Sequence, residues 1–143
     1  LQRGVDAVAA QAAAFPVRPR VYFEEWDEPR ISGIQWVAEL VRIAGGDDIF
    51  PELAAESLAK HRILASDDRI LEREPQIVFG SWCGKKFQPG TVAARPGWGA
   101  VPAVRDGQLF EIKSPIILQP GPAALTDGLA EMHAHVARWV AAR

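Results

Sequence analysis

The sequence predicts an α/β protein of the Rossmann-like, three-layer kind, with a mostly parallel sheet covered by helices on both faces. Two observations support this class. Short runs of β-branched and aromatic residues alternate with longer segments in which apolar residues recur at helical spacing. Glycine and proline separate most of these segments. Strands that alternate with helices in this way form parallel sheets whose two faces are both buried.

The first segment, residues 5–15, is rich in alanine and predicts a helix that ends at Pro16. No capping residue marks the start of this helix, so we expect residues 1–16 to be the end of a longer helix. The segment lacks the basic region and the cleavage site that frame a secretory signal.

The first strand is predicted at residues 21–23, where β-branched and aromatic side chains are consecutive. Charged residues and Trp26 follow it directly, at the end of the strand where ligands bind in open α/β sheets. Apolar residues then recur at helical spacing from Ile34 to Ala44. Gly45 and the glycine after it supply a left-handed stop for this helix.

The rest of the chain continues the alternation. The expected elements are a short helix within 51–60, a brief strand at 62–64, a helix from Ser66 to the residue before Pro75, a buried strand at 76–80, a helical segment at 87–94 and a strand at 108–112. A long amphipathic helix is expected at the C-terminus. Its apolar face carries Leu125, Leu129, Met132, Val136 and Val140.

Composition limits the classes of function. The 143 residues suffice for one domain, and 48% hydrophobic with 24% charged residues is ordinary for a globular protein. A net charge of −2 gives no electrostatic basis for binding nucleic acid. No apolar run approaches the roughly 20 residues that span a bilayer. The single cysteine, Cys83, excludes an internal disulfide and a cysteine-based zinc site, and no metal site is predicted.

Two patterns that resemble catalytic elements have simpler explanations. The Gly-Gly-Asp-Asp segment at 45–48 follows a helix rather than leading into one, so a helix cap is favoured over a phosphate loop. His133 and His135 are two residues apart on a helix and point in different directions, unlike a metal-ligand pair. Cys83 leaves one alternative open, a small α/β enzyme that uses this thiol, but no histidine base lies close in sequence. We therefore predict no catalytic residue.

Trp26 and Trp82 are the strongest candidates for ligand contact, because each follows a predicted parallel strand directly. With Glu25 and Lys85 they predict a mixed apolar and polar rim suited to a bulky ligand. The alternative is that one or both indoles pack beneath loops. Of the remaining tryptophans, Trp36 is expected in the core within the helical apolar pattern, Trp98 at the far edge of the sheet, and Trp139 on the last helix, covering the core.

Five segments occur in the order found in the cobalamin and iron-siderophore binding proteins of ABC importers: VYFEEWDEP, WVAELVRIAGGDDIF, SDDRILEREPQIVFGSW, RPGWGAVPAVRDGQLFEI and LQPGPAALTDGL. From Arg18 onward the chain resembles the C-terminal lobe of the cobalamin-binding branch. The resemblance implies two α/β lobes joined by one long rigid helix, with the ligand between the lobes. Residues 1–16 would then end that helix, and residues 17–143 would form the C-terminal substrate-binding lobe. The N-terminal lobe, with half of the site and a signal peptide for periplasmic export, is expected outside this sequence.

The same resemblance implies that each lobe offers an acidic residue to an arginine pocket on the membrane permease. Asp68 matches that position in the segment SDDRILEREPQIV, and Asp67 is its neighbour, whereas family members with this role usually carry glutamate. A carboxylate in the first turn of a helix also stabilises the helix dipole, and both roles can hold together.

Cobalamin or a related corrinoid is the ligand that the resemblance implies, and Trp26 and Trp82 would supply apolar walls for it. A ferric siderophore or a haem would instead favour cations, which Arg30, Arg62, Lys85 and Lys86 offer. The residues expected to contact ligand are Glu25, Trp26, Arg30, Arg62, Trp82, Cys83 and Lys85. No resident cofactor is expected besides this transported metal chelate.

Overall fold

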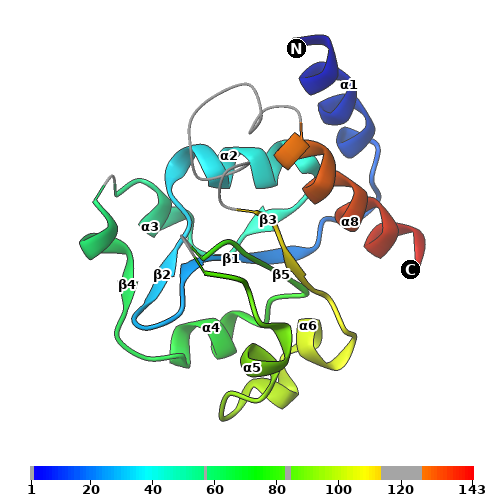
Figure 1. Cartoon of the computed structure of the whole chain (residues 1–143). Helices are drawn as coiled ribbons and strands as arrows, with labels where there is room; N and C mark the ends of the chain where they lie inside the picture. The colour runs from blue at the N-terminus through cyan, green and yellow to red at the C-terminus, as the bar shows by residue number, and fades with distance from the viewer. Residues whose placement is uncertain (1, 57, 83–84, 114–126) are drawn as a thin grey trace.

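A computed structural model describes residues 2–56, 58–82, 85–113 and 127–143 of the chain. A twisted sheet lies between two layers of helices (Figure 1). The three-layer α/β class predicted from the sequence is therefore confirmed.

The sheet has the strand order β4-β2-β1-β5-β6, and β3 pairs with β1 beside this path. The strands are β1 (Arg20–Trp26), β2 (Arg30–Ser32), β3 (Asp47–Asp48), β4 (Ile63–Leu64), β5 (Ile77–Gly80) and β6 (Leu109–Glu111). Among the described residues, β1 pairs in parallel with β3 and β5, and β5 pairs in parallel with β6. The pairings β1–β2 and β2–β4 are antiparallel. The sheet is thus mostly parallel, as predicted, with an antiparallel extension at one side.

Helices cover both faces of the sheet. They are α1 (Gln2–Ala13), α2 (Gln35–Ala44), α3 (Pro51–Ala54), α4 (Asp68–Arg73), α5 (Pro89–Ala93), α6 (Pro102–Arg105) and α8 (Leu129–Ala141), with 3₁₀ turns η1 (Ala59–Arg62) and η2 (Trp98–Ala100). In Figure 1, α1, α2 and α8 lie on one side of the sheet, and α4, α5 and α6 lie on the other. No helix within the described ranges is long and apolar enough to cross a membrane.

Two hydrophobic clusters result, one on each face. Along β1, Val21 and Phe23 enter the cluster under α2 and α8, whereas Tyr22 between them enters the opposite cluster. Both faces of β1 are buried because helices cover both sides of a parallel sheet. Burying such aliphatic and aromatic side chains contributes about 1.5–3 kcal/mol each.

The local signals in the sequence place most helix ends correctly. Gly45 caps α2 in the left-handed region with φ 109°, which a residue without Cβ adopts at little cost. The hydroxyl of Ser66 accepts a hydrogen bond from the Asp68 amide, where α4 begins. The helix expected within 51–60 is the single turn α3. Leu125, assigned to the C-terminal helix, lies outside the described residues.

Three features differ from expectation or add to it. Asp47 and Asp48, interpreted as part of a helix stop, also form β3. Trp36 is only partly buried, at the margin of the α2–α8 cluster. Trp98 is fully buried and packs beside Tyr22 of the central strand, with the ring centroids 6.2 Å apart. Its place is therefore under the middle of the sheet rather than at the far edge.

Candidate ligand-binding site

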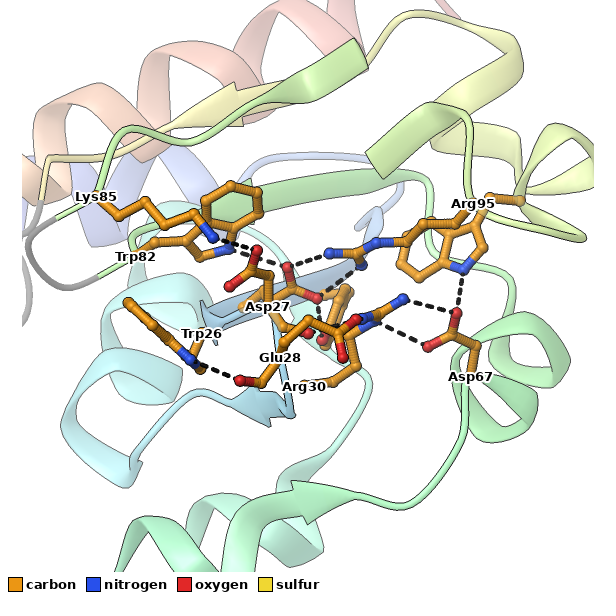
Figure 2. Close-up of polar contacts among 11 residues, drawn as sticks. Trp26, Asp27, Glu28, Arg30, Asp67, Trp82, Lys85 and Arg95 are labelled. Atoms are coloured by element: carbon orange, nitrogen blue, oxygen red, sulfur yellow. Dashed lines mark hydrogen bonds and ion pairs between the residues drawn. The ribbon is translucent and has the colours of Figure 1, made fainter. Parts of the chain in front are cut away.

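The C-terminal ends of β1 and β5 lie side by side, because Glu24 is in register with Gly80 in a parallel pair. The residues that follow each strand therefore meet at one edge of the sheet, as Figure 2 shows. Trp26, Trp82 and Lys85, three of the predicted ligand residues, come together there. This edge is where open α/β sheets bind ligands.

Lys85 lies at the centre of this group. Its Nζ is 2.6 Å from Oδ2 of Asp27. The same ammonium lies 5.4 Å from the ring centroid of Trp26 and 5.0 Å from that of Trp82, within the range of cation–π attraction. The Lys85 side chain nevertheless remains 46% exposed. The ammonium thus lies over two indole faces while the side chain as a whole stays partly in contact with solvent.

Both indoles are held in place through their N–H groups. Trp26 Nε1 donates to the carbonyl oxygen of Glu28 at 2.9 Å. Trp82 Nε1 donates to Oε2 of Glu24 at 3.0 Å, and its ring packs edge-on against Phe87 with centroids 4.9 Å apart. Trp26 is partly exposed, whereas Trp82 is 2% exposed with Lys85 above it. In this lobe Trp26 is the more accessible wall.

Asp27 carries the charge that holds Lys85. Burial favours the protonated carboxyl, but the hydrogen bond from Lys85 and nearby backbone amides outweigh it, so the pKa of Asp27 lies below its usual value. The carboxylate therefore stays ionised over the physiological range. Its second oxygen, Oδ1, is buried and has no hydrogen-bond partner among the described residues. Such an acceptor is costly to leave unsatisfied.

Glu24 anchors the site from inside the core. Its buried carboxylate accepts hydrogen bonds from Tyr22 at 2.8 Å, from Trp82, and from two nitrogens of Arg95 at 2.9 Å each. Burial, with the adjacent Glu24 charge, raises the pKa of Tyr22 well above its ordinary value, so the phenol remains a donor. Arg95 in turn lies over the Trp98 ring, 4.8 Å from its centroid. Sequence reasoning missed this network, since no local pattern links positions so far apart.

Arg30 and Asp67 form a second pair on the same side of the sheet (Figure 2). Arg30 Nε donates to Oδ1 of Asp67 at 3.0 Å, and its Nη1 donates to the Asp27 carbonyl at 2.7 Å. Asp67 also accepts a hydrogen bond from Trp98 Nε1 at 2.8 Å. Both side chains are largely buried. Asp67 therefore fixes the turn after β1, whereas Asp68 points into solvent and is exposed.

Glu25 and Arg62 pair with each other rather than with the tryptophans. Arg62 Nη1 lies 2.9 Å from Oε2 of Glu25, and both side chains are mostly buried. Oε1 of Glu25 accepts the Ile34 amide at 2.9 Å, just before α2 begins. Arg62 also donates to the carbonyls of Ser32 and Glu56. The pair ties β2, η1 and the start of α2 together, and its part in ligand binding stays a prediction.

Cys83 and the sequence's other candidate groups do not add a catalytic or metal site to the described part of the chain. Cys83 lies outside the described residues. Within the described ranges, no group of three or more His, Cys, Asp or Glu residues could hold a metal ion. An open groove of about 570 Å³ lies between α2 and α3 beside β3, and it contains none of the predicted ligand residues. Trp26, Trp82 and Lys85 at the sheet edge therefore lie outside this groove.

Residues 1–116 match the family described as periplasmic binding protein. The chain belongs to the periplasmic binding protein family. Its members bind substrates and are not enzymes, and membership implies a periplasmic or other extracytoplasmic location. No curated protein sequence matches the chain.

The fold is also similar to that of several solved structures. The periplasmic vitamin B12 binding protein BtuF of Vibrio cholerae has a TM-score of 0.73 at 19% identity, over 99% of this chain and 52% of its own. The periplasmic haem-binding protein BhuT, in complex with two haems, has a TM-score of 0.74 at 19% identity, over 97% of this chain and 53% of its own. An Fe³⁺-hydroxamate transport protein of Saccharomonospora viridis has a TM-score of 0.72 at 18% sequence identity. The match covers 94% of this chain and 46% of that protein. This chain spans about half the length of each.

Proposed function

We propose that this chain is the C-terminal, ligand-capturing lobe of a substrate-binding protein that serves an ABC importer of metal chelates. Residues 17–143 form the lobe in this proposal, and a second lobe completes the site. The observation that carries it is the rim of Trp26, Trp82, Lys85 and Asp27 at the C-terminal ends of β1 and β5. In a family member that spans half the length of its structural relatives, such an open rim suits one side of a cleft between lobes.

Helix α1 has the features of an interlobe connection. It is held at its C-terminal end, where Phe15 stacks on His133 with ring centroids 5.7 Å apart. His133 also bridges Gln11 of α1 and the Ala44 carbonyl at the end of α2, at 2.8 and 3.0 Å. Most of the other described side chains of α1 are exposed or only partly buried. We therefore propose residues 1–16 as the end of the helix that joins this lobe to the other.

A corrinoid such as cobalamin is the ligand we favour. A bulky, mostly neutral ligand needs apolar walls with a few polar groups, which Trp26 and its neighbours supply. A carboxylate-bearing haem or an anionic siderophore needs cations, but Arg30 and Arg62 are already paired with carboxylates. Lys85 is likewise paired with Asp27, so of the cations named from the sequence the exposed Lys86 remains. Ferric siderophore or haem is thus the alternative ligand class.

Asp68 is the residue we assign to permease docking. Its exposed position at the start of α4 leaves it accessible to an arginine on a membrane partner. Asp67, the other candidate, is largely occupied by Arg30 and Trp98. An exposed carboxylate fits docking better than a paired and mostly buried one.

Ligand titration of the full-length receptor tests the function. We expect saturable quenching of tryptophan fluorescence by cobalamin or cobinamide, and weaker effects from haem and ferric siderophores. The isolated chain should bind far more weakly, because half of the contacts are missing while the entropic cost of capture remains. Absence of saturable binding to all four ligand classes by the full receptor would refute the proposal. Submicromolar binding by residues 1–143 alone would refute the shared cleft.

A further inference from the structure

Trp26, Trp82 and Asp27, at the ends of β1 and β5, have the composition of a cation-binding cage. The cation that they hold is the ammonium of Lys85, from the same chain. Proteins recognise organic cations by placing them against aromatic faces, often beside a carboxylate. Here two indoles and the carboxylate of Asp27 surround one ammonium, that of Lys85 (Figure 2). The position of Lys85 therefore indicates that these three side chains stabilise an ammonium group.

The walls are fixed, while the occupant is tethered by a flexible chain. Trp26 and Trp82 each donate their N–H to a defined acceptor, so the indoles keep their orientation without the lysine. The Asp27 side chain is only 13% exposed, against 46% for Lys85. Four rotatable bonds let the lysine ammonium swing into solvent. The subsite can thus be vacated without rebuilding its walls.

The unsatisfied atom at this subsite is an acceptor. Lys85 uses Oδ2 of Asp27, and Oδ1 is buried with no hydrogen-bond partner among the described residues. A ligand nitrogen that carries several N–H groups can satisfy both oxygens. A ligand carboxylate would instead face the Asp27 charge in a partly dry site. The subsite therefore calls for a hydrogen-bond donor.

We propose that Trp26, Trp82 and Asp27 form a subsite for a donor nitrogen of the ligand, an ammonium in preference to an amide, which Lys85 fills until the ligand displaces it. This inference rests on the proposed function, since the ligand is the one the receptor captures. A cationic nitrogen of the ligand carries the same charge as the Lys85 ammonium, so it can take the place of that ammonium beside Asp27. Chelates with amine or amide side groups are then favoured over those with peripheral carboxylates.

Titration of residues 1–143 with small probe molecules tests the subsite. The probes are n-butylammonium and butyrate, and the signals are the indole N–H resonances of Trp26 and Trp82, assigned through tryptophan-to-phenylalanine variants. If lysine fills the subsite about 90% of the time, Lys85→Met should tighten butylammonium binding about tenfold. Lys86→Met, which removes the neighbouring exposed cation, is the matched control and should change nothing. Asp27→Asn should abolish the butylammonium response.

The proposal fails if Lys85→Met leaves butylammonium affinity unchanged or lowers it, or if butyrate shifts the same resonances as strongly. Should Asp27→Asn not fold, as judged by its thermal melt, the comparison of the two lysine variants decides alone. Corrinoid titration of the full receptor is a separate measurement. A receptor that binds no chelate refutes the proposed function even when the subsite binds butylammonium, so the two failures are distinguishable.

Discussion

Glu24 and Arg95 meet inside the core through two parallel hydrogen bonds of 2.9 Å, although 71 residues separate them in sequence. Their side chains are 1% and 7% exposed. Because Glu24 also accepts the Trp82 indole N–H, the pair fixes a wall of the candidate site as well as the packing under the sheet. The stability of the core and the geometry of the site therefore depend on the same carboxylate.

Loss of the arginine should destabilise the fold strongly. Arg95→Met leaves Glu24 as a buried charge without its counter-ion, which costs about 3–5 kcal/mol in the free energy of unfolding. Urea unfolding followed by circular dichroism measures this. The double variant Glu24→Gln with Arg95→Met removes both charges and should recover part of the loss. A single variant that loses less than about 1 kcal/mol would show that the pair is not the structural anchor we describe.

Trp26→Ala should weaken ligand binding by the full receptor by about 1–3 kcal/mol, because it removes a partly exposed apolar wall. Its thermal melt should change little, since the side chain is partly exposed and its N–H donates to the nearby Glu28 carbonyl. Unchanged affinity, measured by calorimetry with the bound chelate, would place Trp26 outside the site.

Trp82 requires a different substitution, because it is 2% exposed and packs against Phe87. Trp82→Ala should cost about 3–5 kcal/mol of folding stability and would confound a binding measurement. Trp82→Phe keeps a smaller aromatic ring above the core and removes the N–H bond to Glu24. We expect a folded receptor with reduced affinity. Full affinity in Trp82→Phe would show that this indole serves packing alone.

The class of fold was predictable from the sequence because its signals are local. The run that becomes β1 and the strand at 77–80 contain consecutive β-branched and aromatic residues, and glycine after residue 44 ends α2. The same local argument, that residues after parallel strands meet at one edge, brought Trp26, Trp82 and Lys85 together correctly.

The partnerships of charged groups were not predictable, because they depend on register and on contacts between distant segments. Nothing near Arg62 in the sequence indicates that it pairs with Glu25, 37 positions earlier. The bond from the Trp98 indole to Asp67 likewise needs the loop of η2 to fold beneath α4. The antiparallel strand β2 was also missed, since Ile31 is its one β-branched residue and polar residues flank it.

Asp48 should make stability depend on pH between about 4 and 6. Burial raises the pKa of this carboxyl from 3.8 to about 6, so the folded state holds a proton that the unfolded state releases in this range. Its contribution is fully present below pH 3.8 and is lost as pH rises through about 6. Asp48→Asn should therefore stabilise the protein at pH 7.5 by up to about 3 kcal/mol. The gain should shrink at pH 4.5; equal gains in melting temperature at both pH values would contradict this assignment.

Asp68→Ala should separate transport from ligand capture. Its side chain is exposed at the start of α4 and is not among the residues proposed to contact ligand, so chelate affinity of the full receptor should stay unchanged. Loss of a first-turn carboxylate should cost at most about 1 kcal/mol of stability. Uptake into vesicles that contain the permease and ATPase should fall, because the proposed arginine partner loses its counter-charge.

Two control variants make this measurement specific. Asp106→Ala removes an exposed carboxylate at the turn between α6 and β6 and should leave uptake intact. Asp67→Ala removes the partner of Arg30 and Trp98 and should lower folding stability by about 1–3 kcal/mol. If Asp68→Ala reduced chelate affinity as much as uptake, the residue would belong to the ligand site. If it left uptake unchanged, another surface of the lobe would have to meet the permease.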